Sequence, residues 1–125
     1  YVISQDQYNI GLKDGPEYVF YPDSSIAELI EWKSGEKNGE WSKYSISGKP
    51  SLKAFYYEDQ LHGAYIQYFK DGNKSVEGSY NKGLKDGNWV YYSTNGSQEK
   101  MQVYEYGDLI KTLTKENGEI KTIHH

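Results

Sequence analysis

A 24-residue repeat is the feature of this 125-residue chain that most constrains its fold. An aromatic residue recurs every 24 positions, a first glycine follows three residues later, and a second glycine follows four residues after the first. The aromatic positions are Tyr8, Trp32, Tyr56, Tyr80 and Tyr104. A strict period of this length predicts stacked supersecondary units, each of which buries its apolar side chains against its neighbours.

The glycines of each repeat predict turns, because glycine reaches positive φ at low steric cost. We assign turns to Gly11, Gly15, Gly35, Gly39, Gly63, Gly83 and Gly87. Asp59 replaces the first glycine in the third copy, and Asp tolerates a left-handed backbone. A second turn signal follows at Asp71-Gly72 and Asn95-Gly96, pairs that are typical of tight hairpin turns.

The segments between the turns predict β-strands, because they are short runs rich in Tyr, Trp, Val and Ile. Each repeat then forms two antiparallel strands. The predicted fold is all-β, a single-layer antiparallel β-hairpin meander or solenoid of about ten strands. Residues 26–31 show helical spacing, but the equivalent segment one period later begins with Pro50, which favours a strand in both places.

The repeat also predicts the organisation of the whole chain, residues 1–125, as a single domain with capped ends. The predicted parts are an N-terminal cap at 1–7, four repeats at 8–103 and a degenerate C-terminal cap at 104–125. Val2 and Ile3 suit an edge strand, and Lys111 replaces the second glycine near the C-terminus. Terminal lysines discourage pairing between exposed edges, although self-association through an edge strand remains open.

Equivalent residues lie two strands apart, about 9.5 Å, so their rings form rows across the sheet. The first row is Trp41, Tyr65 and Trp89, the second is Phe20, Tyr44, Tyr68 and Tyr92, and the third is Trp32, Tyr56, Tyr80 and Tyr104. The first two rows are three residues apart within each strand, an odd number, so we expect them on opposite faces. A sheet that stacks rings in this way needs little core.

Composition excludes several classes of function. The net charge of −4 gives no electrostatic reason to expect nucleic acid. The sequence contains no Arg for bidentate clamps and no Cys for disulfides or thiolate chemistry. The chain begins at Tyr1 rather than Met, which is consistent with removal of a leader from a secreted or lipid-anchored protein, and the compartment stays open.

Catalytic chemistry has few candidate residues. His62 is the single histidine outside the C-terminal pair, and we expect it in an exposed turn. Nothing in the sequence places a nucleophile and an orienting carboxylate beside it. The Asp-Gly turns lack the alternating acidic residues of a calcium loop. The sequence therefore predicts a protein that is not an enzyme and that uses no metal or cofactor.

The pattern Tyr-x-x-Gly-x-x-x-Gly-x-Trp-x-x-Tyr, followed by a turn glycine, resembles the MORN repeat. It is most similar to the bacterial variant found in proteins labelled MORN-variant antitoxins, and it spans about residues 8–107. The best copy is Tyr80, Gly83, Gly87, Trp89, Tyr92 and Gly96. The resemblance implies a β-hairpin solenoid that binds protein partners or, in other members, lipids. The antitoxin label implies neutralisation of a toxin by binding.

The aromatic rows are the candidate binding face. The residues are Trp41, Tyr65 and Trp89 of the first row, with Tyr44, Tyr68 and Tyr92 of the second. Rows of aromatic rings among polar groups are typical of interface hot spots, so we expect a protein partner. Two alternatives stay open. One is a groove for a small ligand, glycan or lipid head group, and the other is a structural spacer.

Overall fold

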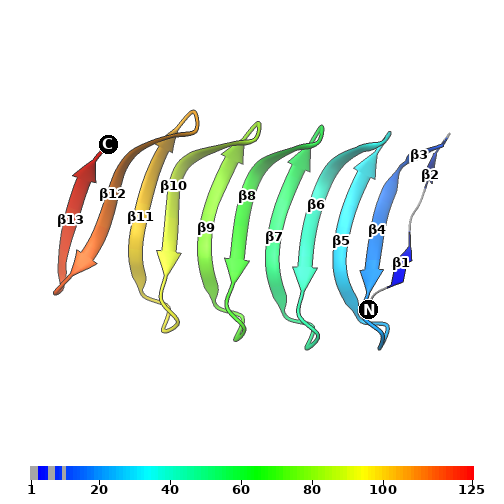
Figure 1. Ribbon diagram of the computed structural model, residues 1–125, viewed down its shortest axis with the longest axis horizontal. Helices are drawn as coiled ribbons and strands as arrows, with labels where there is room; N and C mark the ends of the chain where they lie inside the picture. Colours follow the sequence, from blue (N-terminus) through cyan, green and yellow to red (C-terminus); the bar gives the residue numbers. More distant parts are fainter. Residues whose placement is uncertain (1–2, 6–7, 10) are drawn as a thin grey trace.

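The computed structural model describes residues 3–5, 8–9 and 11–125, with side chains described from residue 11 onward. Eleven strands form one antiparallel sheet in which neighbours in space are, after β1, also neighbours in sequence (Figure 1). The strands are β1 (Ile3–Gln5), β4 (Gly15–Phe20), β5 (Ile26–Lys33), β6 (Glu36–Tyr44), β7 (Pro50–Tyr57), β8 (Gln60–Tyr68), β9 (Lys74–Asn81), β10 (Leu84–Tyr92), β11 (Gln98–Glu105), β12 (Asp108–Glu116) and β13 (Glu119–His124), with a small hairpin of β2 (Tyr8–Asn9) and β3 (Leu12–Lys13). The expected all-β hairpin meander is confirmed.

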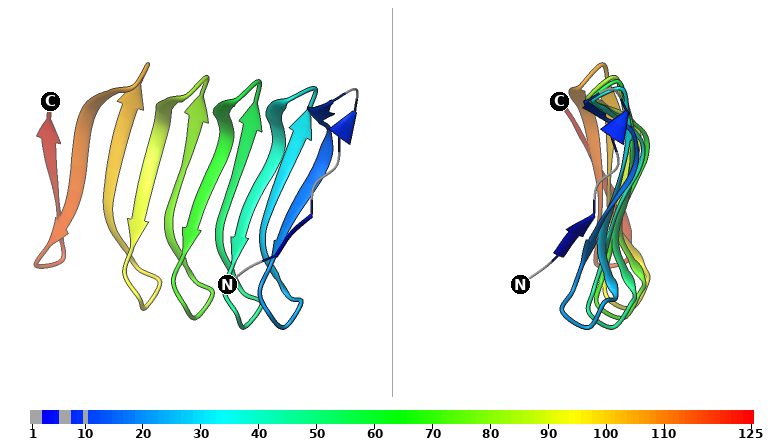
Figure 2. Two further views of the ribbon diagram at one scale, coloured as in Figure 1. Left: turned by 45° about the vertical axis from the view of Figure 1, so that its right-hand side comes forward. Right: turned by 90° about the vertical axis from the view of Figure 1, so that its right-hand side faces the viewer.

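The sheet is a single layer with almost no interior. Seen from one end, its strands lie behind one another in a thin, curved sheet (Figure 2). Among the described residues, the buried apolar side chains are Leu52, Ala54 and Trp89. Residues 26–31 lie in β5, so the strand expected there is confirmed. No helix capable of crossing a bilayer occurs in the described part of the chain.

The N-terminal edge strand agrees with the sequence only where the structure describes it. Ile3 lies in β1, which pairs antiparallel with β4. Val2, expected in the same strand, lies outside the described residues.

Two-residue turns join β5, β7, β9 and β11 to the strands that follow them, at one edge of the sheet (Figure 1). Lys82 and Gly83 have φ values of 48° and 84°, and Glu58 and Asp59 have 49° and 66°. Two successive positive φ angles define the type I′ turn, whose twist matches that of the flanking strands. The turns predicted at the first glycine position are confirmed at Gly35 and Gly83, and Asp59 takes the same role.

Each of these turns also bonds to the repeat before it. The Gly83 amide donates to the Leu61 carbonyl at 2.8 Å, and the Lys82 amide donates to Nδ1 of His62 at 3.0 Å. His62 therefore lies within β8 and not in a turn, contrary to expectation. The turn is complete after Asp59, so His62 is already in the strand, where its ring links two repeats.

The second glycine of each repeat lies inside a strand, and the turns predicted at Gly39, Gly63 and Gly87 are wrong. These residues belong to β6, β8 and β10. Tyr56 pairs with Leu61, whereas Ala54 pairs with Tyr65, so residues 62–64 lie opposite one residue of β7. The excess residues form a bulge, and Gly63 supplies its positive φ of 103°. Gly15, with a φ of 88°, is likewise the first residue of β4.

At the other edge of the sheet, the loops after β4, β6, β8 and β10 are wider than the predicted tight hairpin turns, whereas a two-residue turn joins β12 to β13. In the loop of Asp71-Gly72, the Phe69 amide donates to the Asn73 carbonyl at 2.7 Å. The Asp71 carboxylate also accepts from the Asn73 amide at 3.0 Å. Such an Asx turn uses a side chain in place of a backbone carbonyl.

The C-terminal cap continues the sheet with an altered register. Tyr104 pairs with Leu109 and Val103 with Lys111, so the bulge contains one extra residue, Ile110, instead of two. Lys111 stands where the earlier repeats have the bulge glycine. A one-residue slip reverses the alternation of side chains. Leu113, the counterpart of Trp89, consequently pairs with Met101 on the opposite face.

Candidate functional site

Strand pairing places one row of side chains across β6 to β9. The row is Trp41, Ala54, Tyr65 and Gly78, so large and small residues alternate between strands. The alternation lets a ring from one strand cover the small residue of the next. A Cβ added to Gly78 would lie 2.2 Å from the indole of Trp89, and Ala54 is 0 % exposed.

The third aromatic row packs against the first. Ring centroids lie 5.6 Å apart for Trp41 and Tyr56, 5.4 Å for Tyr65 and Tyr80, and 5.1 Å for Tyr80 and Trp89. We call this surface the aromatic face. It comprises Trp32, Trp41, Tyr56, Tyr65, Tyr80, Trp89 and Tyr104.

The spacing of residues in the sequence could have indicated that the first and third rows share a face. Tyr56 pairs with Leu61, and Leu61 precedes Tyr65 by four residues. An even separation within a strand keeps side chains on one face, provided that the excess at the bulge is also even.

The expected binding residues of the first row have different degrees of exposure. Trp41 and Tyr65 are half-buried and reach the surface. Trp89 is only 2 % exposed, because it rests on Gly78 and contacts the rings of Tyr65, Tyr80 and Tyr104. Trp89 belongs to the core and is not an accessible binding residue, which corrects its place in the predicted face.

The second row lies on the other side of the sheet, as its odd spacing predicts. The Tyr92 hydroxyl donates to Glu77 at 3.0 Å, and Glu77 pairs with Ile66 and Val90 in the row opposite the aromatic face. Lys74, at 2.9 Å, and Tyr92 lower the pKa of the Glu77 carboxyl. Tyr44, Tyr68 and Tyr92 therefore share no surface with Trp41 and Tyr65, and the candidate set divides between two faces.

Carboxylates hold two of the indole rings. Trp32 donates through Nε1 to Glu17 at 2.8 Å, and Trp41 donates to Glu28 at 2.7 Å. Glu17 lies 24 residues before Trp41, so it occupies the position in the first repeat that is aromatic in the next three. The structure shows that it orients the ring of the next repeat.

Lysine side chains lie over other rings of the aromatic face, and the sequence analysis did not identify them. Lys37 Nζ lies 5.1 Å from the centroid of Tyr56, and Lys85 Nζ lies 4.6 Å from that of Trp89. A cation over an aromatic face is attracted by the ring quadrupole. The sequence did contain a signal for these contacts. Lysine recurs at one position of the repeat, as Lys13, Lys37 and Lys85, and each of these residues pairs with the repeat aromatic of its hairpin.

The phenols of the aromatic face are partly shielded from water. Burial is the main cause that raises the pKa values of the Tyr56 and Tyr80 phenols above 10.0, with a smaller contribution from Tyr65. Burial opposes the charged form of a phenol.

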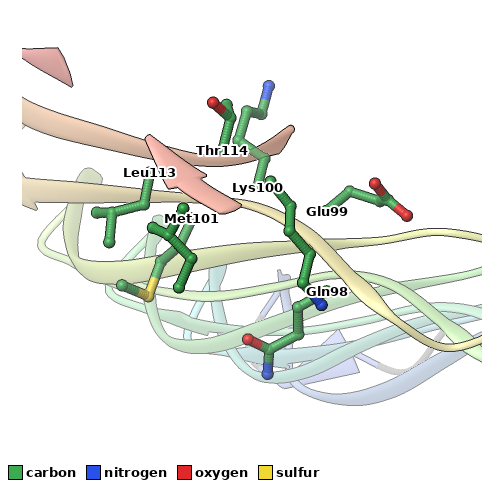
Figure 3. A pocket seen from close by; sticks show the side chains of 8 residues that line it. Gln98, Glu99, Lys100, Met101, Leu113 and Thr114 are labelled. Carbon is green, nitrogen blue, oxygen red and sulfur yellow. The ribbon is translucent and has the colours of Figure 1, made fainter. Parts of the chain in front are cut away.

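A separate hollow of about 230 Å³ lies between the last three strands (Figure 3). Met101 of β11 and Leu113 of β12 lie beside each other in its wall, and Ile120 of β13 adds an apolar side chain that is 69 % exposed. The register slip at Lys111 creates this hollow, because it turns Leu113 away from the aromatic face.

In residues 3–5, 8–9 and 11–125, no three His, Asp or Glu side chains gather where they could hold a metal ion. His62 is exposed, and its Nδ1 accepts a backbone hydrogen bond.

No protein-family model matches this chain. A comparison with curated proteins likewise finds no match. The resemblance to the MORN repeat rests on the residues given above and stays a prediction.

Proposed function

We propose that this chain is a non-catalytic module that binds a protein partner through the aromatic face. The observation that carries the proposal is the continuity of that face across the repeats. Its half-buried rings are Trp32, Trp41, Tyr56, Tyr65, Tyr80 and Tyr104. Aromatic residues in packed surroundings supply much of the binding energy of protein interfaces.

Several rings of the aromatic face are held by neighbouring side chains before a partner binds. Tyr80 packs edge-on against Trp89, and the Trp32 and Trp41 indoles are held by Glu17 and Glu28. Side chains that are already ordered lose little entropy when a partner binds. A broad, single-layer surface favours a macromolecule, because small ligands prefer concave pockets.

The resemblance to MORN-variant antitoxins supports one class of partner within this proposal, a toxin that is neutralised when the module covers it. The Tyr-x-x-Gly-x-x-x-Gly-x-Trp-x-x-Tyr pattern carries that resemblance. A small ligand, a glycan or lipid head group, and a spacer role are the competing functions.

A pair of labelled variants tests which face binds. The chain has no cysteine, so one thiol can be introduced at a time. Gln67 and Ala64 are both exposed on β8, three residues apart and therefore on opposite faces. Gln67 donates to the Tyr65 hydroxyl at 3.1 Å, which places it on the aromatic face. Gln67→Cys and Ala64→Cys are each coupled to a bulky maleimide and used to capture proteins from cells of the source organism.

We expect the label at Gln67→Cys to abolish capture of the partner and the label at Ala64→Cys to leave it unchanged. Circular dichroism confirms that both labelled forms are folded. Equal capture by the two forms would refute the proposal, as would capture of nothing by the unlabelled chain. A change in tryptophan fluorescence with choline or an oligosaccharide would instead support a small-ligand site.

A further inference from the structure

The two faces of the sheet differ in charge. Strand pairing, with its bulges taken into account, assigns the paired charged residues from β7 through β11 to one face or the other. The aromatic face carries Lys85 and Lys100 there, and no carboxylate of these described strands joins them. The opposite face carries Glu77, Asp86 and Glu105 against Lys53 and Lys74, the last of which pairs with Tyr68 and bonds to Glu77. From β7 to β11 the aromatic face is thus basic, on a protein of net charge −4, whereas at β4 and β5 the same face also carries Glu17 and Glu28.

Two lysines of the aromatic face, Lys37 and Lys85, form no ion pair with any of the described residues. Ion pairs in the described part of the chain join Lys13 to Glu17, Lys74 to Glu77 and Lys121 to Glu116. Lys37 and Lys85 have no carboxylate within 4.0 Å among the residues described. The Asp59 carboxylate near Lys37 accepts instead from the Lys37 backbone amide at 2.7 Å.

Each of these two ammonium groups lies between two rings. Lys37 Nζ is 5.9 Å from the Trp32 centroid and 5.1 Å from that of Tyr56. Lys85 Nζ is 4.6 Å from Trp89 and 5.2 Å from Tyr104. An ammonium has three N–H donors, and contact with a ring face leaves donors for a carboxylate of a partner.

The spacing of these groups selects the shape of the partner. Lys37, Leu61 and Lys85 occupy equivalent positions, each paired with the repeat aromatic across the tight turn. Equivalent positions lie two strands apart, about 9.5 Å. A polyproline II helix has three residues per turn and rises about 9.3 Å per turn. Its every third side chain points the same way and therefore matches one repeat.

The geometry points to an acidic protein segment in the polyproline II conformation as the occupant of the aromatic face. It lies across the strands, with two acidic side chains six residues apart on Lys37 and Lys85 and an apolar side chain between them on Leu61. This inference rests on the proposed function and specifies the chemistry of the partner. Aromatic grooves recognise polyproline II segments because such segments are already ordered.

A labelled peptide tests the inference directly. The probe is fluorescein-labelled Gly-Glu-Pro-Pro-Leu-Pro-Pro-Glu-Gly, and binding is followed by fluorescence anisotropy. A peptide of the same composition with adjacent glutamates tests the spacing. The variants are Lys37→Gln with Lys85→Gln, and the matched control is Lys53→Gln with Lys111→Gln. All four lysines are half-buried, and the control pair lies on the opposite face.

We expect saturable binding of the spaced peptide, with a Kd that rises about tenfold in the Lys37/Lys85 variant. The control variant should change Kd less than about twofold, and added salt should weaken binding. Absence of saturation at about 1 mM peptide, or equal affinity for the adjacent-glutamate peptide, would overturn the inference.

Two further probes distinguish an acidic peptide from other polyanions. Thymidine oligonucleotides and vesicles containing anionic lipid are titrated under the same conditions. Tighter binding of either, with the same dependence on Lys37 and Lys85, would overturn the inference. If the peptide fails while the label at Gln67→Cys still abolishes capture of the partner, the inference is wrong and the proposed function stands.

Discussion

At the scale of single residues, the sheet depends on small side chains that lie beneath large ones. The Trp89 indole is buried because Gly78 has no Cβ to keep it away, and the Trp89 Nε1 then donates to the Ser79 carbonyl at 3.1 Å. One repeat earlier, Ala54 pairs with Tyr65 at the equivalent positions. Trp89, the larger ring, thus lies over glycine, and Tyr65, the smaller ring, lies over alanine, so the two repeats are packed to a similar density.

Substitution of Gly78 tests this packing. We expect Gly78→Ala to lower the free energy of unfolding by about 1–3 kcal/mol, because the new methyl group overlaps the indole. The double variant Gly78→Ala with Trp89→Tyr recreates the Ala54–Tyr65 combination and should recover part of the loss relative to the two single changes. Urea denaturation followed by circular dichroism measures all four proteins. A Gly78→Ala protein as stable as the parent would contradict the close contact.

Tyrosine ionisation provides a second prediction at this scale. Burial raises the pKa values of Tyr56, Tyr80 and Tyr91 above 10.0. The unfolded chain therefore releases these protons first as the pH rises. The free energy of unfolding should stay constant up to about pH 9 and fall above about pH 10. Urea titrations at stepped pH, with phenolate absorbance, measure the fall, and Tyr80→Phe should make it shallower.

At the scale of elements, the strand bulges decide which side chains share a face. Two excess residues in β8 preserve the alternation, so the rings of Tyr56 and Tyr65 lie on the same face, the aromatic face. One excess residue in β12 reverses it and sends Leu113 to the other side. Glycine at the bulge permits the positive φ of 103° seen at Gly63.

The bulge glycines should respond to alanine in a graded way. Gly63→Ala should cost about 1–2 kcal/mol through backbone strain, because its nearest new contact would be Phe55 Cβ at 3.8 Å. Gly39→Ala should cost more, because its Cβ would lie 2.8 Å from Oε1 of Glu31. Thermal and urea unfolding of both variants provide the comparison. Equal losses would show that the Glu31 contact contributes nothing.

At the scale of the whole molecule, the described part of the chain is a single-layer β-sheet without a second layer packed on either face. Its accessible surface is 7937 Å² for 14.4 kDa, against about 6,800 Å² for a compact protein of that mass. The excess arises because each repeat contacts only its neighbours. The same geometry exposes two broad faces, of which one carries the aromatic rows and, from β7 to β11, a basic charge.

Small-angle X-ray scattering tests this shape. A compact chain of this length has a radius of gyration of about 14 Å. We expect a larger value, with a scattering profile that fits a flattened, elongated particle. A value at or below that of a compact chain would mean that the sheet folds back on itself in solution.

Much of the fold follows from local signals in the sequence. The period, the strand propensities and the first glycine of each repeat predict antiparallel hairpins joined in sequence order, and residues 26–31 follow the repeat against their helical spacing. The sequence also predicts Trp41 and Tyr65 as aromatic residues of an accessible face, and both are half-buried in the structure. Their role in binding stays a prediction.

The sequence by itself determined the order of the strands and the pairing of neighbours, because turn chemistry and strand propensity act within a few residues. Only the tertiary structure decided the burial of Trp89, the union of two aromatic rows and the separation of charge between the faces. Each depends on partners across strands, and the register of those partners depends on the size of the bulge at the second glycine. A residue and its sequence neighbours can predict a strand, but the exposure of its side chain depends on the residues that pack against it from adjacent strands.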